Sequence, residues 1–288
     1  MTTTVIGRVE LRRVEEFHKA SHVGHITPDA DLVEANRHWL APLWLREDGS
    51  WQLTFQSWIL IVGGRVIVID PCNGNARPHC QPWFDHLDFP YIERFAATGV
   101  RPEDVDFVFC THMHHDHCGW NTHLRNGRWV PTFPNARYLF ARREYERWDS
   151  SRPGYRHVDY NEGIYERSIL PVMEAGLTDL IGDRHKVLDG LTIEAAPGHT
   201  LGHSLAHLVS DRAEALFSGD AFHHPLQLVR PEIQFGDCDD VEQAIATRRA
   251  LVKRAAATGA LIIPAHLPAP HCLRISRGEE GFVFSAGA

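Results

Sequence analysis

Short apolar runs, separated by turn residues, recur along the chain. Residues 52–70 have the β-branched and aromatic composition of two strands, and Gly63 and Gly64 between them indicate a hairpin. A shorter strand is predicted over 106–110. Three later runs, LTIEAA, SLAHLV and EALFSG, each end near a glycine, a histidine or an aspartate. The pattern therefore predicts strands that deliver polar side chains to one edge of a sheet.

Helical patterns alternate with these strands. They are predicted over residues 90–98, 142–148, 159–175 and 240–257. Gly99 suits the end of the first helix, and further strands are predicted over 137–140 and 260–266. No repeat of fixed short period and no long Pro/Ser-rich linker divides the chain. We therefore expect one domain over residues 1–288 with a layered α/β arrangement.

Composition and charge narrow the class of protein. Hydrophobic residues make up 43% and charged residues 23%, as in an ordinary folded protein. The net charge is −8 with neutral histidine, and the basic residues are scattered, which argues against a groove that binds nucleic-acid phosphates. The apolar run SWILIVGGRVIVID is too short and too broken to span a membrane, and the N-terminal stretch lacks the apolar region of a signal peptide. We expect a cytoplasmic protein that binds neither nucleic acid nor membrane; a homodimer stays open.

Cysteine usage fits the same compartment. The six cysteines form no CxxC pair and are sparse for the length of the chain. In a cytoplasmic protein they are expected to be free thiols, several of them buried, and not a disulfide framework. Cys118, although it follows a cluster of histidines, is expected to serve packing.

The histidines are concentrated in THMHHDHCGW, residues 111–120. His112 and His114 are two residues apart, so on an extended segment their imidazoles lie on the same side. Asp116 and His117 follow where the chain is expected to turn into a helix, so they can face a neighbouring point. One short loop could therefore serve two metal ions. Nitrogen and oxygen ligands without a thiolate favour zinc, with iron, manganese or cobalt as alternatives.

Further candidate ligands stand at the ends of predicted strands. APGHTLGHS presents His199, FSGDAFHH presents Asp220 and IIPAHLPAPH presents His266. Each follows an apolar run and adjoins glycine or proline. A rigid sheet would hold such ligands at one rim.

The motif HMHHDH, followed by GH at His199, SGD at Asp220 and AH at His266, resembles the metallo-β-lactamase-fold hydrolase superfamily. The resemblance begins at Asp70, in the family's early strand-end aspartate position, and so covers most of the chain. It implies a four-layered αββα sandwich with the active site along one edge.

The resemblance also implies roles for individual residues. It assigns His112, His114 and His199 to a first metal, Asp116, His117 and His266 to a second, and Asp220 to a bridge between them. Asp70 would accept a hydrogen bond from a ligand or fix the metal loop, with a strand-end cap as the alternative. His115 and His203 are not expected to be ligands. The set looks like that of dinuclear lactonases, glyoxalase II enzymes and phosphotriester hydrolases, whereas an aspartate at 220 disfavours zinc β-lactamases with a cysteine ligand.

Hydrolysis is the chemistry that such a site predicts. Two divalent ions that share a water lower its pKa and supply hydroxide, and Asp116 could help to move the proton. We expect a zinc-dependent hydrolase of a carboxylic ester, with a lactone as the foremost substrate. The alternative within hydrolases is a phosphotriester or another neutral ester. The alternative from another class is an oxidoreductase that acts on thiol or sulfur compounds with a single iron.

One position departs from the family pattern. In the homoserine lactonases a tyrosine lies three residues after the bridging aspartate, and here that position is His223. A neutral imidazole can donate a hydrogen bond and can also protonate a leaving alkoxide, so His223 is expected to be catalytic. His224 is the competing histidine, and a strand-end cap is the alternative role. An apolar pocket wall, or else ordinary core packing, is expected of six aromatic residues: Trp120, Trp129, Phe133, Tyr155, Tyr160 and Phe222.

Overall fold

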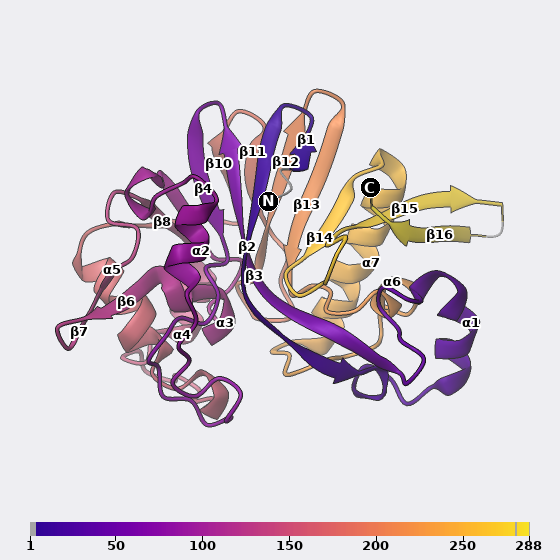
Figure 1. The fold of residues 1–288 in the computed structure, drawn as a ribbon, viewed down its shortest axis with the longest axis horizontal. Helices are drawn as coiled ribbons and strands as arrows, with labels where there is room; N and C mark the ends of the chain where they lie inside the picture. Colours follow the sequence, from indigo (N-terminus) through magenta and orange to yellow (C-terminus); the bar gives the residue numbers. More distant parts are fainter. Residues whose placement is uncertain (1–3, 280, 288) are drawn as a thin grey trace.

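The computed structural model describes residues 4–279 and 281–287. Two seven-stranded sheets lie face to face in the middle of the molecule, and helices flank them on both sides (Figure 1). This is the αββα sandwich that the resemblance implied. Among the helices of these residues, none is long and apolar enough to cross a membrane.

The first sheet has the strand order β1-β2-β3-β4-β5-β8-β9. Its strands are β1 (Thr4–Ile6), β2 (Val9–His22), β3 (Ser50–Val62), β4 (Arg65–Ile69), β5 (Phe107–Phe109), β8 (Arg137–Ala141) and β9 (Thr178–Ile181). β4, β5, β8 and β9 pair in parallel, so the chain must cross over between them through helices. The crossovers carry α2 (Tyr91–Ala97), α3 (His115–Cys118), α4 (Arg142–Trp148) and α5 (Leu170–Glu174). As a result, the segments that follow β4 and β5 emerge at the same edge of the sheet.

The second sheet follows the sequence order β10 to β16. Its strands are β10 (Arg184–Leu188), β11 (Leu191–Ala195), β12 (Ser204–Ser210), β13 (Ala213–Gly219), β14 (Leu261–Pro264), β15 (Leu273–Gly278) and β16 (Gly281–Ala286). Its one parallel pair among the described residues is β13 with β14, joined through α6 (Leu226–Val229) and α7 (Val241–Thr258). That pairing brings the ends of β13 and β14 to one edge.

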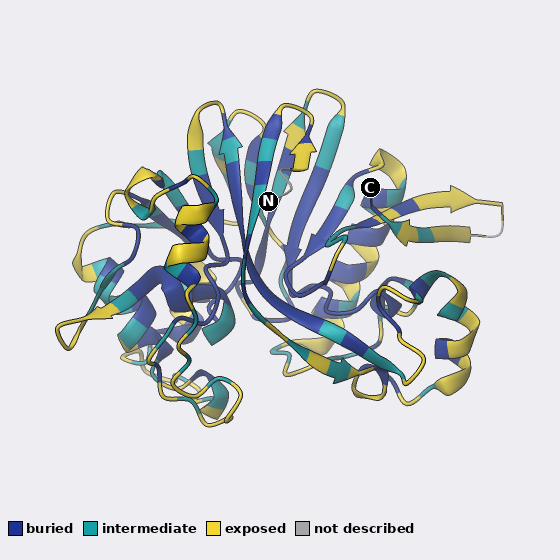
Figure 2. Ribbon diagram, in the orientation of Figure 1, coloured by how far each residue is buried: buried dark blue, intermediate teal, exposed yellow. Residues whose placement is uncertain are grey.

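Apolar side chains from both sheets form the central core. Figure 2 shows the strands in the middle of the molecule buried over most of their length, with exposed turns at the top. The two sheets contribute to one buried cluster, with Leu60 and Ile67 from the first sheet and Leu208 and Phe217 from the second. Two further clusters lie under the helices on either side. The sandwich is therefore held by apolar burial in three adjoining layers.

A long ribbon links the sandwich to the side of the molecule where α1 (Ala30–Leu40) lies (Figure 1). β2 and β3 pair in antiparallel register from Glu10 opposite Ile61 to His22 opposite Ser50, with an irregularity between Glu15 and Phe17. The sequence patterns did not predict β2 or α1. They also did not predict the small hairpin of β6 (Thr122–Arg125) and β7 (Arg128–Pro131), nor β15 and β16.

The predicted helix over 159–175 is wrong as a continuous element. The segment begins with a 3-10 turn at Asp159–Asn161, is interrupted at Gly163, and continues as a π-helix at Tyr165–Ile169 before α5. Gly163 has a φ of 69°, in the left-handed region that ends helices. The side-chain amide of Asn161 donates to the carbonyl of Met113 at 2.9 Å, so this turn is held against the histidine loop.

Candidate metal centre

The loops at one edge of the sandwich bring together all seven candidate ligands. Together with His223, they fall into overlapping groups whose imidazole and carboxylate donor atoms lie within 4.8 Å of one another. The groups are His112/His114/His199, His112/His117/Asp220, Asp116/His117/His266 and His199/Asp220/His223. Four ligands come from the loop after β5 and from α3, in the first half of the chain, and three from the loops that precede β12 and follow β13 and β14.

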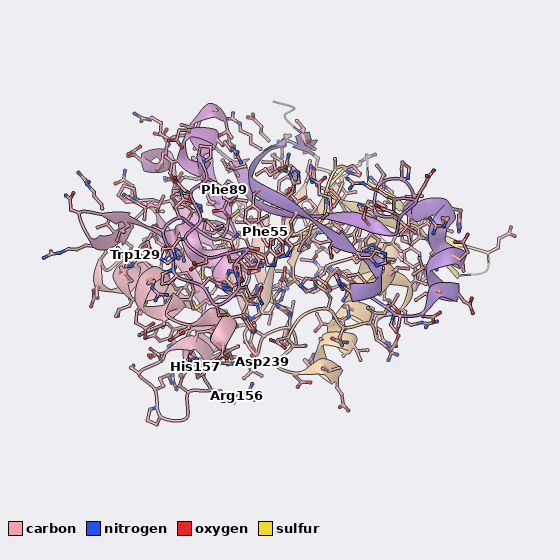
Figure 3. All side chains as sticks on the ribbon, turned by 60° about the horizontal axis from the view of Figure 1, so that its bottom comes forward. Phe55, Phe89, Trp129, Arg156, His157 and Asp239 are labelled. Atoms are coloured by element: carbon pink, nitrogen blue, oxygen red, sulfur yellow. The ribbon has the colours of Figure 1, made fainter. Side chains whose placement is uncertain are left out.

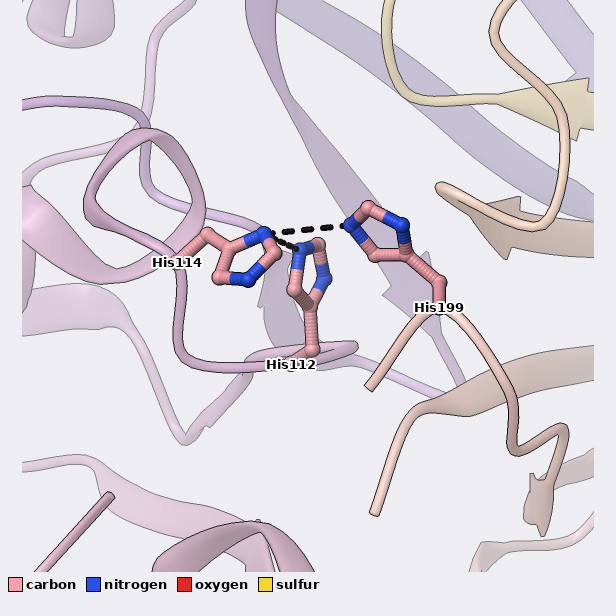
Figure 4. Close-up of side chains that lie close together, drawn as sticks. All are labelled: His112, His114 and His199. Atoms are coloured by element: carbon pink, nitrogen blue, oxygen red, sulfur yellow. Dashed lines mark hydrogen bonds between the residues drawn. The ribbon is translucent and has the colours of Figure 1, made fainter. Parts of the chain in front are cut away.

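The first group consists of three imidazoles that converge (Figure 4). Nδ1 of His114 lies 2.9 Å from Nε2 of His112 and 3.1 Å from Nε2 of His199. Burial lowers the pKa of His114 to about 3, and burial with the neighbouring histidines lowers the pKa of His112 and His199 well below the ordinary value. All three rings are therefore neutral at pH 7, the form in which imidazole binds a metal.

The group of Asp116, His117 and His266, called the second group from here on, combines a carboxylate with two imidazoles. Nε2 of His266 lies 3.4 Å from Oδ2 of Asp116 and 3.2 Å from Nε2 of His117. Burial lowers the pKa of His117 and His266, but the carboxylates of Asp220 and Asp116 raise it by more than burial lowers it. Both pKa values therefore lie above the ordinary value of histidine. The carboxylates therefore favour protonation of these histidines, and a divalent cation could take the place of the protons.

Asp220 lies between the two groups. Its Oδ2 is 3.3 Å from Nε2 of His117 and 3.5 Å from Nε2 of His199, and its Oδ1 is 3.2 Å from Nε2 of His266. Oδ1 is buried and makes no hydrogen bond of good geometry among the described residues, although Nε2 of His266 lies at ion-pair distance. A buried carboxylate is costly unless hydrogen bonds or a cation satisfy both of its oxygens. The donor set therefore fits two divalent metal ions with Asp220 between them.

Asp70 contacts both the histidine loop after β5 and the candidate ligand His117. Its carboxylate accepts hydrogen bonds from the backbone nitrogen of Thr111 at 2.7 Å and from Oγ1 of Thr111 at 2.9 Å. Nδ1 of His117 lies 3.1 Å from Oδ2 of Asp70. The contact with the histidine loop is thus a pair of hydrogen bonds, whereas the contact with His117 is an ion-pair distance without hydrogen-bond geometry.

His115 and His203 do not belong to the candidate ligand groups. Nδ1 of His115 lies 3.1 Å from the side-chain oxygen of Asn73. The ring of His203 accepts a hydrogen bond from the backbone nitrogen of Asp220 at 3.1 Å, and its other nitrogen lies 2.9 Å from the carbonyl of Ala196. His203 therefore supports the turn that presents Asp220.

The structure distinguishes the two histidines that follow Asp220. Nε2 of His223 lies 2.9 Å from Oδ2 of Asp220, and its ring lines the cleft over the metal centre. His224 is buried away from that cleft, with Nε2 3.1 Å from the carbonyl of Trp44. His223 is therefore the histidine that faces the site.

A cleft of about 280 Å³ opens over the candidate ligands. Its apolar wall is formed by Leu53, Phe55, Phe84 and Phe235, and its polar lining includes Lys19 and Asp237. In Figure 3, which turns the lower edge of Figure 1 forward, Phe55 lies near the middle of the molecule. The cleft has the size and the mixed lining of a small-molecule site.

Of the six aromatic residues proposed for the pocket wall, only Tyr160 lines this cleft. Trp120, Phe133 and Phe222 are core residues. Trp129 lies toward one side in Figure 3, with the guanidinium of Arg77 4.1 Å above its ring. The remaining residue, Tyr155, packs against the buried cluster under α2 to α5. Closeness to the histidine motif in the sequence did not distinguish residues of the cleft wall from core residues, because both kinds of residue are apolar.

The sequence analysis proposed Tyr160 only for the pocket wall, and it missed two buried glutamates. Oη of Tyr160 lies 3.1 Å from Nε2 of His114, the nitrogen that points away from His112 and His199. Glu16 and Glu144 are fully buried carboxylates, each surrounded by hydrogen-bond donors. A glutamate in a charged helix or strand gives no sequence signal of burial. Neither Glu16 nor Glu144 could therefore have been predicted from the spacing of motifs.

Comparison with known proteins agrees with this geometry. A family profile described as the metallo-beta-lactamase superfamily matches residues 51–266. The N-acyl homoserine lactonase AttM of Rhizobium johnstonii is 27% identical over 223 residues, which cover 73% of this chain and 77% of the relative. AttM of Azorhizobium caulinodans is also 27% identical, over 231 residues, with the same coverage of both chains.

Solved structures share the fold. Hydrolase AbOPH of the β-lactamase superfamily superposes with a TM-score of 0.79 at 23% identity, over 99% of this chain and 97% of the other. AidC, a dizinc quorum-quenching lactonase, superposes with a TM-score of 0.76 at 18% identity, over 100% of this chain and 97% of the other.

Proposed function

The chain belongs to the metallo-beta-lactamase superfamily, and from that premise we propose that it is a metal-dependent hydrolase of carboxylic esters with a lactone as its foremost substrate. The observation that carries the proposal is the position of Asp220, whose buried carboxylate lies between two groups of candidate ligands. The chain is similar to N-acyl homoserine lactonases, which supports a lactone as the substrate.

Seven side chains would hold two ions, and we propose zinc for both. The first ion would be held by His112, His114 and His199, the second by Asp116, His117 and His266, and Asp220 would contact both. Nitrogen and oxygen donors without a thiolate suit zinc in such a site. When bound, the pair of ions would supply hydroxide at neutral pH and polarise the substrate oxygen.

Asp116 is placed to carry a proton. Its carboxylate lines the cleft and lies 3.4 Å from Nε2 of His266. Burial raises the pKa of Asp116, but the neighbouring His117, His115 and His266 lower it to about 2. The group is therefore ionised at neutral pH and can accept a proton from water as the ester is attacked.

His223 and the apolar wall would position the substrate. The imidazole of His223 is at the cleft side of Asp220 and can donate a hydrogen bond to a carbonyl oxygen or a proton to a leaving alkoxide. Phe55, Phe84 and Phe235 offer apolar surface for an acyl or alkyl substituent. The arrangement needs no serine or cysteine nucleophile.

A substrate panel with metal analysis tests the proposal. Purified protein is assayed against lactones with and without an acylamino group, aryl esters, phosphotriesters and thiols, and metal content is measured on the same sample. We expect two zinc ions per chain and turnover fastest on a lactone. If a phosphotriester were hydrolysed faster than any lactone, the proposed substrate class would be wrong. One iron per chain together with thiol oxidation would show that the proposed reaction is wrong.

A further inference from the structure

Glu144 lies in α4, fully buried, and accepts four hydrogen bonds. Its Oε1 accepts from the backbone nitrogen of Met113 at 2.8 Å and from the indole of Trp148 at 2.7 Å. Its Oε2 accepts from the hydroxyl of Thr200 at 2.7 Å and from the backbone nitrogen of Gly202 at 3.1 Å. Both oxygens are thus fully used.

The partners of Glu144 belong to two different ligand loops. Met113 stands between His112 and His114, and Thr200 directly follows His199. One carboxylate therefore holds the backbone of the first loop with one oxygen and the backbone and hydroxyl of the second loop with the other. The three histidines concerned are those of the converging first group.

The second loop packs directly against the helix that carries Glu144. A β-carbon at Gly202 would lie 2.1 Å from the backbone nitrogen of Glu144, closer than any real contact. Only glycine allows the loop to approach α4 so closely. The position of this loop is thus fixed by steric contact as well as by the carboxylate.

We propose that Glu144 is a positioning residue that sets the separation between the His112–His114 loop and the His199 loop, and so determines the metal affinity of the first group. Glu144 is not among the residues that line the cleft, so it acts through the backbone of the two loops. The inference rests on the metal centre of the proposed function.

The test measures metal binding without turnover. His266→Ala removes a ligand of the second group, so in this background a zinc titration of metal-free protein against a competing chelator reports the first group. Glu144→Gln keeps the size of the side chain but replaces one acceptor oxygen with an NH2 group that cannot accept. We expect the dissociation constant for zinc to rise about ten- to a hundredfold, the usual effect of removing a group that orients metal ligands.

Glu16→Gln is the matched control. Glu16 is also fully buried and accepts four hydrogen bonds, two from Asn73 and one each from Gly74 and Trp120. None of these partners lies in the two loops that carry the first group. We expect Glu16→Gln to lower the melting temperature as Glu144→Gln does, but to leave the zinc affinity of the first group unchanged.

Thr200→Val and Thr200→Ser keep the inference testable if Glu144→Gln does not fold. Valine removes the hydroxyl that Glu144 holds and should weaken zinc binding, whereas serine keeps that hydroxyl and should restore it. An unchanged affinity in Glu144→Gln or Thr200→Val, or an equal loss in Glu16→Gln, would overturn the inference alone. If neither the wild-type protein nor the His266→Ala variant bound metal, the proposed function would be overturned as well.

Discussion

His223 is the side chain that most clearly separates catalysis from metal binding. It contacts Asp220 and lines the cleft, but the chain has seven other side chains for the two ions. We predict that His223→Phe keeps both metals and lowers kcat about ten- to a thousandfold, the effect of losing one transition-state donor or general acid. Steady-state kinetics on the best substrate, with metal content measured on the same sample, checks this.

His224→Gln provides the control for that substitution. His224 is buried and lies 3.1 Å from the carbonyl of Trp44, outside the cleft. This variant should lose stability while its folded fraction turns over substrate at the wild-type rate. A His223→Phe protein with wild-type kcat would show that His223 has no part in the reaction.

The charge states of the two ligand groups predict how metal uptake depends on pH. Burial lowers the pKa of His117 and His266, but the carboxylates of Asp220 and Asp116 raise it by more, well above the ordinary value for His117, so metal-free protein holds protons there more readily than a free imidazole does. Binding of the second ion must displace them. Affinity for that ion is therefore full above the raised pKa values and falls as the pH drops through them.

Titration calorimetry in buffers with different ionisation enthalpies measures this release. We expect proton release at pH 7 from wild-type protein, and less from His266→Ala. The first group, whose histidines are neutral because burial lowers their pKa, should contribute none. Metal uptake without proton release at pH 7 would contradict the assigned charge states.

The candidate ligands could be predicted from the sequence because each one lies in a short motif at the end of a strand. Their neighbours could not. Glu144 contacts Met113, Thr200 and Gly202 only after α4 packs against two loops, and Phe84 and Phe235 reach the cleft from segments without regular structure. Local pattern carries no information about such contacts.

Among the secondary-structure elements, the strands that were predicted are those buried on both faces or clearly alternating. β2, VELRRVEEFHKASH, was missed because one of its faces carries charged side chains that stay partly exposed. β16 is mostly exposed, so apolar patterning does not define it. The helix over 159–175 was predicted as continuous because its composition is helical, while Gly163 and the contact of Asn161 with Met113 decide where it breaks.

The approach of the loop after β4 to the segment after α3 depends on Gly119. A β-carbon there would lie 1.7 Å from the carbonyl oxygen of Asn73. We predict that Gly119→Ala destabilises folding by at least about 2 kcal/mol, because backbone on both sides must move. Gly182→Ala, where a β-carbon meets nothing within 4 Å, should change stability by no more than about 0.5 kcal/mol.

Urea unfolding of the two variants checks this pair. Neither glycine has a positive φ, so any difference between them is steric and not conformational. Equal free energies of unfolding would show that the two segments can separate without cost.

The molecule as a whole divides its ligands between two halves. The first sheet and its helices carry the histidine loop, and the second sheet carries His199, Asp220 and His266. Bound ions would therefore join the halves and stabilise the folded state, by about 2.7 kcal/mol when free metal is one hundred times its dissociation constant. We predict that a chelator lowers the melting temperature and abolishes turnover, and that zinc restores both.

Asp220→Ala distinguishes this effect from non-specific metal binding. Without the carboxylate between the groups, turnover should be lost and zinc should raise the melting temperature less than in the wild type, even at high zinc. A melting temperature in Asp220→Ala that responds to zinc as in the wild type would show that Asp220 does not join the two groups.

The parallel pairing of β13 with β14 has a consequence for protein synthesis. His266, at the end of β14, contacts His117 across 149 residues of sequence. A chain emerges from the ribosome N-terminus first, so the whole histidine loop leaves the tunnel long before β14 is translated. A metal ion captured by the nascent chain before His199 is translated meets only the ligands of that loop. The complete centre forms only after translation has passed His266 and β14 has docked beside β13.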